Sequence, residues 1–222
     1  MKKEEILLKT EEFVKQCMEG DSSGHDWWHI HRVRNIAVKI AKVENADLFI
    51  VELAALLHDI SDWKFSDEKE NQEQSKVRIW LEQMKVEDNF ISHICEIIKD
   101  LSFKGAGVST NMKTLEGIIV QDADRLDAIG AIGIARTFAY GGSKGREIYN
   151  PKILPVLHQS FEEYKNTKAP TLNHFYEKLL LLKDRMNTDS AKNIAVERHS
   201  FMVTFLEHFF METWLNKESY SE

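Results

Sequence analysis

The chain has 222 residues, of which 43% are hydrophobic and 29% are charged, a balance typical of a soluble globular protein with one large core or two small ones. Its formal net charge of −7 argues against capture of DNA, RNA or an anionic membrane by a broad basic surface. With only Cys17 and Cys95, we expect no disulfide framework, and the sequence excludes a cysteine-based zinc site.

The N-terminal segment comes first in chain order. Residues 1–5 mix acidic and basic side chains, and only a short apolar stretch follows them. This pattern fits neither a signal peptide nor a membrane anchor, so the sequence favours a cytoplasmic protein with no membrane partner.

Apolar residues then recur three and four positions apart along nearly the whole chain, which contains ten Gly and three Pro. This period predicts an all-α fold. The predicted helices span residues 3–19, 26–44, 47–60, 67–84, 88–101, 112–128, 130–140, 152–165, 171–186 and 189–216. The irregular stretches between them, at 61–66, 103–111 and 141–155, are too short to be domain linkers. We therefore expect a single domain over residues 1–222, with a core at about 20–140 and a C-terminal helical appendage at about 150–216, as a monomer or homodimer.

The predicted helix 26–44 carries a histidine on its apolar stripe. His29 shares that stripe with Val33, Ile36 and Ile40, so its imidazole should point toward the core. A lone histidine in such a place is more often a core residue bonded to a backbone carbonyl than a metal ligand. His31 is about 200° further round the helix, so the two histidines cannot bind one ion.

The predicted helix 47–60 ends with two metal-competent side chains. His58 and Asp59 follow the apolar run 51–57, where a buried helix would normally carry more apolar residues. Burying an imidazole and a carboxylate together costs several kcal/mol unless each finds a partner, and a divalent cation satisfies both.

The predicted helix 112–128 adds two carboxylates, Asp124 and Asp127, to an apolar face. His29, the His58–Asp59 pair and Asp124 would together supply two imidazoles and two carboxylates from three helices, as in metal sites of helical bundles. This donor set suits a six-coordinate divalent ion such as Mn²⁺, Fe²⁺, Co²⁺ or Ni²⁺, with Mg²⁺ or Zn²⁺ as alternatives. Four protein ligands would leave two positions open for catalysis.

Three segments resemble the HD-domain metal-dependent phosphohydrolases, whose signature is a histidine, a later His-Asp pair and a distal aspartate on successive helices. They are GHDWWHIHRV at 24–33, AALLHDI at 54–60 and QDADRLDAIG at 121–130. The order and spacing of the residues in these segments resemble the small bacterial branch typified by YpgQ and YedJ more closely still. The resemblance covers most of the chain and implies that His29, His58, Asp59 and Asp124 bind one divalent cation, with Mn²⁺ expected first.

The resemblance also suggests roles around the metal. Asp62 and Asp67 resemble acidic residues that handle water or the leaving group in some HD nucleotidases, although Asp67 could instead cap the next helix. Asp127, one turn beyond Asp124, could orient a ligand or form a salt bridge between helices, whereas Asp122 is expected to be structural.

Lys64, Lys104 and Arg125 are candidates for binding phosphate oxygens. Trp27, Trp28 and Trp63 flank the proposed ligands in sequence and could stack on a nucleobase, although aromatic residues at helical spacing are more often core.

The resemblance implies metal-assisted hydrolysis of a small nucleotide. For the YpgQ-like branch, this would be cleavage of a nucleoside or deoxynucleoside triphosphate between the α and β phosphates, which gives a monophosphate and pyrophosphate. A 5′-nucleotidase acting on deoxynucleoside monophosphates is one alternative. A non-catalytic nucleotide sensor that keeps the metal for binding is another.

Overall fold

The computed structural model describes residues 2–20, 26–60, 73–101, 112–157 and 169–213. The chain divides into two compact units, one reaching Asp124 and the other beginning at Arg125. Every regular element in the described residues is a helix, which confirms the predicted all-α class. Among these helices, none combines the length and the apolar character that a membrane crossing requires.

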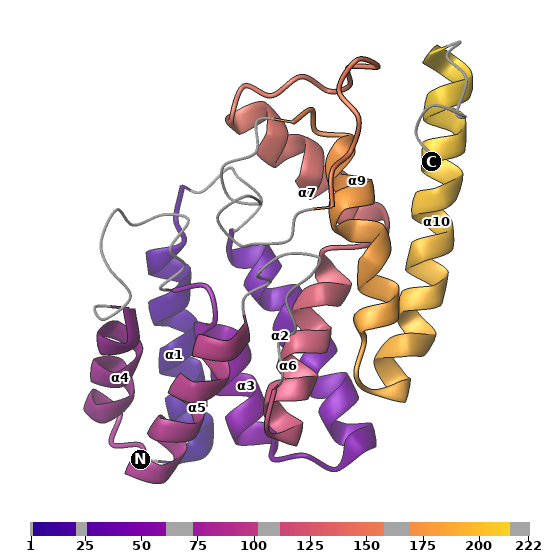
Figure 1. The fold of residues 1–222 in the computed structure, drawn as a ribbon. Coiled ribbons are helices and arrows are strands. Elements are labelled where there is room, and N and C mark those ends of the chain that lie inside the picture. The colour runs from indigo at the N-terminus through magenta and orange to yellow at the C-terminus, as the bar shows by residue number, and fades with distance from the viewer. Residues whose placement is uncertain (1, 21–25, 61–72, 102–111, 158–168, 214–222) are drawn as a thin grey trace. The chain divides into compact units, whose positions relative to one another are not determined.

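The first unit is a helical bundle around α3 (Figure 1). Its helices are α1 (Lys3–Cys17), α2 (Trp27–Glu44), α3 (Leu48–Leu57), α4 (Glu73–Gln83), α5 (Asp88–Leu101) and the part of α6 (Leu115–Asp127) up to Asp124. Helix α3 packs against α1, α2 and α5, and α4 packs against α5. This arrangement makes α3 the central element of the unit.

The sequence of α3 explains its central place. Eight of its ten residues are buried, so the helix is apolar almost all round, as a core helix must be. At its start, the Asp47 side chain accepts hydrogen bonds from the backbone N–H groups of Phe49 and Ile50. This cap satisfies donors that the first turn would otherwise leave without a partner.

A polar contact joins three helices of this unit. Arg34 of α2 donates to Glu52 of α3 through Nε and Nη2 at 3.0 and 2.8 Å, and to Glu11 of α1 through Nη1 at 2.8 Å. Because the planar guanidinium reaches two carboxylates in fixed directions, this contact sets the register of α1, α2 and α3.

The second unit contains α7 (Gly130–Ser143), α9 (Asn173–Glu177), the 3₁₀ helix η1 (Leu179–Arg185) and α10 (Asp189–Thr213). Helix α10 packs against α7 and η1. Phe138, Phe175 and Phe205 bring their ring centroids within about 6 Å of one another, so aromatic contacts join α7, α9 and α10.

Two predicted helices were wrong in this unit. Residues 152–157 form a turn and an irregular segment instead of starting a helix, and Pro155, which lacks an N–H, lies within them. The rest of the prediction 152–165 lies mostly outside the described residues. The predicted helix 171–186 is divided into α9 and η1 at Lys178, whose φ of −143° is not helical.

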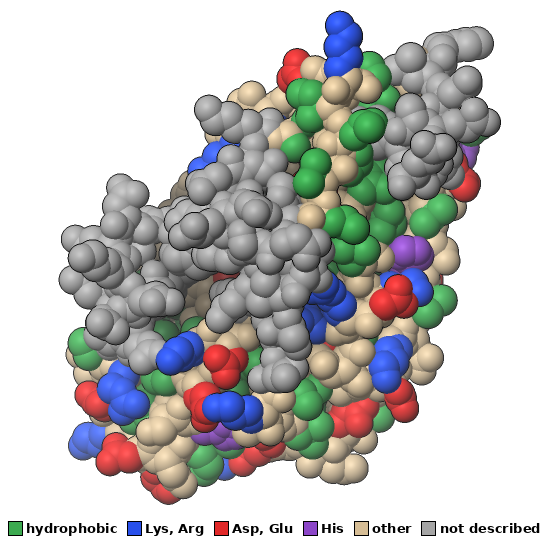
Figure 2. All heavy atoms as spheres, in the orientation of Figure 1, with side chains coloured by type: hydrophobic (Ala, Val, Ile, Leu, Met, Phe, Trp, Pro, Cys, Tyr) green, Lys and Arg blue, Asp and Glu red, His purple; other side chains and the backbone are tan. Residues whose placement is uncertain are grey.

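Charged side chains of both signs lie interspersed on the face shown in Figure 2. This mixture agrees with the modest negative net charge of the chain. An extended basic surface for nucleic acid is therefore not a feature of the described residues on that face.

Candidate metal centre

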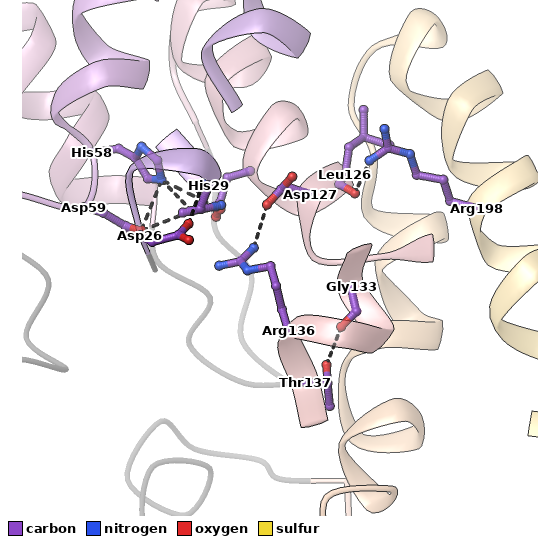
Figure 3. Close-up of polar contacts among 11 residues, drawn as sticks. Asp26, His29, His58, Asp59, Leu126, Asp127, Gly133, Arg136, Thr137 and Arg198 are labelled. Carbon is purple, nitrogen blue, oxygen red and sulfur yellow. Dashed lines mark hydrogen bonds and ion pairs between the residues drawn. The ribbon is translucent and has the colours of Figure 1, made fainter. Parts of the chain in front are cut away.

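Helix α2 places His29 in its first turn. Asp26 is the N-cap residue, and its Oδ1 accepts a hydrogen bond from the backbone N–H of His29 at 3.0 Å (Figure 3). Such a cap fixes where the helix begins, and therefore the direction of the side chain three residues later. The His29 side chain is 1% exposed, so the imidazole points into the unit, as its apolar stripe predicts.

The end of α3 places the other two members of the group. The helix ends at Leu57, His58 is its C-cap residue, and Asp59 follows in the turn. This end is earlier than the predicted one at residue 60. Both side chains reach His29 from this end of the helix.

A backbone carbonyl orients the imidazole ring of His58. Nδ1 of His58 lies 2.7 Å from the carbonyl oxygen of Ala55. A carbonyl can only accept, so Nδ1 carries the hydrogen, and in the neutral ring Nε2 presents a lone pair. This is the form in which an imidazole binds a metal ion, with the other ring nitrogen held by a backbone oxygen.

Three side chains converge on one point (Figure 3). Nε2 of His29 lies 3.3 Å from Nε2 of His58 and 3.1 Å from Oδ2 of Asp59, and Nε2 of His58 lies 3.6 Å from Oδ2 of Asp59. Ligand atoms about 2.0–2.2 Å from a shared ion lie roughly 2.8–3.1 Å apart when they are adjacent in a six-coordinate shell and roughly 3.3–3.6 Å apart in a four-coordinate one. The donor set and its spacing therefore fit a divalent cation.

Asp124 of α6 extends this group. Its Oδ1 lies 3.6 Å from Nε2 of His29 and 3.9 Å from Nε2 of His58. It is not part of the compact triad of ligand atoms that lie within 4.8 Å of one another, and its side chain is 37% exposed. All four predicted ligands are thus brought together, with Asp124 on the open side.

The other charged residues near His29 are used differently. His31 places Nε2 3.0 Å from Nδ2 of Asn35, one turn along α2. Asp26 caps the helix, and Asp122 of α6 is fully buried. None of these three side chains is a member of the triad.

Four predicted site residues, Asp62, Asp67, Lys64 and Lys104, lie outside the described residues. Arg125 lies in the second unit, is 8% exposed and donates from Nη1 to the backbone carbonyl of Arg185. Its role in binding phosphate stays a prediction.

Asp127, also in the second unit, is 1% exposed and pairs with Arg136 of α7 through Oδ2 at 2.9 Å. The structure therefore contains the salt bridge between helices that the sequence left as one of two alternatives. Orientation of a metal ligand by Asp127 stays a prediction.

Two groups that build the centre were not predicted from the sequence. The Ala55 carbonyl orients His58, but any residue supplies a carbonyl, so no sequence signal marks it. Asp26 as the cap of α2 was recognisable in principle, since an aspartate directly before the first helical residue is a common start signal.

Comparison with known proteins places these observations in a family context. The sequence profile of the HD domain matches residues 27–129. Bacillus subtilis YpgQ is 41% identical over 195 residues, which cover 87% of each chain. An HD-superfamily hydrolase from Bacillus thuringiensis has a crystal structure that is similar with a TM-score of 0.72 at 47% identity, over 96% of this chain and 98% of the other. A crystal structure of Bacillus subtilis YpgQ in complex with ADP is similar with a TM-score of 0.73 at 38% identity, over 93% and 97% of the two chains.

Proposed function

This chain belongs to the HD domain family and is a metal-dependent phosphohydrolase, and we propose that its substrate is a nucleoside or deoxynucleoside triphosphate. In this proposal, the bond between the α and β phosphates is cleaved. One water molecule is consumed, and the products are the nucleoside monophosphate and pyrophosphate.

The convergence of His29, His58 and Asp59, with Asp124 beside them, is the observation that carries the proposal. Two imidazole nitrogens and two carboxylates would leave part of a six-coordinate shell for substrate and water. Asp124 is the most exposed of the four, so phosphate oxygens would approach from its side.

A nucleotide substrate is supported by a similar chain. YpgQ of Bacillus subtilis has been crystallised in complex with ADP, and its chain is similar to this one over almost its full length. A diphosphate that carries a nucleoside is close in chemistry to the triphosphate proposed here. The mixed surface charge agrees with a small anionic ligand held at one centre rather than a polymer.

The residues of this chain would have distinct roles at the metal centre. The two histidines and two aspartates would hold one divalent cation, with Mn²⁺ as the first choice and Mg²⁺, Co²⁺, Ni²⁺ or Fe²⁺ as alternatives. When bound, such an ion polarises a phosphoryl oxygen and lowers the pKa of a water molecule. The Ala55 carbonyl keeps the hydrogen of His58 on Nδ1, so that Nε2 stays available as a ligand.

Further roles are proposed from the sequence. Asp62, three residues after Asp59, would accept the proton of the attacking water, and Asp67 would assist it or the leaving group. Lys64, Lys104 and Arg125 would offset negative charge on the phosphates during bond cleavage. Asp127 would support the position of Asp124 from one turn further along α6.

A single ion is enough for this chemistry. His93 of α5 is the only histidine between Asp59 and Asp124 in the sequence, and its Nε2 lies 2.9 Å from Oγ1 of Thr114. In the part of the chain that the structure describes, only one group of side chains has the spacing of a metal site.

The test is phosphorus NMR on Mn²⁺-loaded protein mixed with nucleoside mono-, di- and triphosphates, because the spectrum reports which bond breaks. The expected result is monophosphate and pyrophosphate from triphosphates, with loss of both products when a chelator is added. Orthophosphate from deoxynucleoside monophosphates would instead identify a 5′-nucleotidase. Tight nucleotide binding without any product would identify a sensor.

A further inference from the structure

Three tryptophans lie in the described residues, and they have different surroundings. Trp80 of α4 stacks on Phe13 at a centroid distance of 4.0 Å, and its Nε1 donates to Oγ1 of Thr10. Trp27 is half-buried, with Nζ of Lys15 4.6 Å from its ring centroid. These two rings therefore have packing or cation–π contacts that explain their presence.

Trp28 is different because it is 61% exposed. Its one ring contact within the described residues is with His31, at 5.8 Å between centroids and 87° between planes. Burial of an indole stabilises a fold more than burial of almost any other side chain, and most of that gain is absent here. The fold alone does not explain a tryptophan at this position.

The position of Trp28 relates it to the metal centre. It directly precedes His29 in the first turn of α2, so their Cα atoms are about 3.8 Å apart and their side chains diverge by about 100°. Asp26 caps this turn, and His31 contacts the indole from one turn further along the helix. These contacts hold the backbone that carries Trp28 and His29. An exposed aromatic surface thus lies one residue away from a proposed metal ligand.

We propose that Trp28 is the stacking platform for the nucleobase of the substrate. The inference rests on the proposed function, because it assumes a nucleotide whose phosphates lie at His29, His58, Asp59 and Asp124. A nucleotide extends its base away from its phosphates, and the divergence of Trp28 from His29 matches this requirement. Stacking on an indole accepts every base, since each base has a π face, so Trp28 would provide affinity for nucleotides without selecting one.

The experiment compares two ligands that share a diphosphate and differ in the nucleoside. Binding of ADP and of inorganic pyrophosphate to the full Mn²⁺-loaded chain is measured by isothermal titration calorimetry, for wild type, Trp28→Ala and Trp28→Phe. We expect Trp28→Ala to weaken ADP binding by about 5- to 100-fold and to leave pyrophosphate binding within about twofold. Trp28→Phe should retain most of the ADP affinity because the aromatic face remains.

Trp27→Ala is the matched control, since it removes a neighbouring indole whose ring is already contacted by Lys15. It should change the ratio of ADP to pyrophosphate affinity by less than about twofold. Equal weakening of both ligands by Trp28→Ala would assign the residue a structural role and overturn the inference. Unchanged binding of both would overturn it as well.

Failure of the proposed function gives a different result from failure of stacking. If wild type binds ADP and cleaves triphosphates while Trp28→Ala behaves like wild type, only the stacking inference fails. If wild type binds neither ADP nor any triphosphate, both fail together.

Discussion

Nη1 of Arg136 lies 2.9 Å from Oδ2 of Asp127, which joins the middle of α7 to the end of α6 (Figure 3). The Asp127 carboxylate is 1% exposed, whereas the Arg136 side chain is 16% exposed. A buried carboxylate loses its hydration, and the attraction of a nearby guanidinium offsets part of that cost.

Replacement of Arg136 by alanine should therefore destabilise the protein. We expect Arg136→Ala to lower the free energy of unfolding by about 3 kcal/mol, because it removes a guanidinium that pairs with a buried carboxylate. Chemical denaturation of the metal-free protein measures this change. The double variant Asp127→Asn/Arg136→Ala should lose less than the sum of the two single variants.

The same pair also tests the proposed role of Asp127 near the metal. If Asp127 supports Asp124, Asp127→Asn should weaken metal binding by about 10- to 100-fold in addition to its effect on stability. Competition with a chelating dye measures the metal affinity. Unchanged affinity in a destabilised variant would leave Asp127 with a structural role alone.

The two histidines of α2 give a paired test of the ligand assignment. His29→Ala should abolish the binding of one equivalent of Mn²⁺, because it removes a nitrogen close to both His58 and Asp59. His31→Ala removes an imidazole two residues away that contacts Asn35 instead, and it should keep the metal. Elemental analysis after dialysis against Mn²⁺ reports both results. The assignment would be wrong if the two variants retained equal amounts of metal.

The site was predictable where polar side chains interrupt an apolar pattern. His29 falls on the apolar stripe of α2, and His58 and Asp59 follow the apolar run of α3, so the cost of burying them indicated a shared cation. The Ala55 carbonyl was not predictable, because it depends on where α3 ends. Helical periodicity has an uncertainty of a few residues at that point.

The second unit shows why other parts could not be predicted. Residues 171–186 have helical spacing of apolar residues, yet the backbone N–H groups of Thr171 and Leu172 donate to the carbonyls of Glu147 and Ile148. These bonds join segments more than twenty residues apart, and Lys178 then leaves the helical region. Such tertiary constraints override local propensity and carry no periodic signal.

Metal binding should stabilise the folded protein. Mn²⁺ at about 100 times its dissociation constant adds about 2.7 kcal/mol, which corresponds to a rise in Tm of roughly 5–10 °C for a chain of this size. Differential scanning calorimetry with and without chelator measures the shift. Asp59→Ala, which removes one oxygen of the triad, should show almost no shift on addition of Mn²⁺. A normal shift in this variant would place the ion elsewhere.

A histidine far from the metal centre in sequence should make stability depend on pH. Burial, followed by the charge of Lys183, lowers the pKa of His199 on α10. The unfolded chain therefore binds a proton at this imidazole more readily, so stability should fall as pH drops through about 6.5 and below.

The variant His199→Gln should show a smaller loss of Tm between pH 7.5 and about 5.5 than wild type, because it cannot take up that proton. His208→Gln, which changes an exposed histidine on the same helix, is the control. An identical pH dependence in wild type and His199→Gln would contradict the prediction.

Removal of one charge at Asp62 should separate catalysis from metal binding. Asp62→Asn keeps the size of the side chain but loses the basic carboxylate that is proposed to take a proton from water. A general base typically contributes about 10²- to 10⁴-fold to the rate, so kcat should fall by a factor in that range. The binding of one equivalent of Mn²⁺ and the affinity for ADP should stay unchanged.

Asp26→Asn is a matched control. An asparagine oxygen can still accept the hydrogen bond from the His29 N–H, so this change in the cap of α2 should leave kcat near the wild-type value. Normal turnover in Asp62→Asn would remove Asp62 from the proposed mechanism, and loss of metal in this variant would make it a ligand instead.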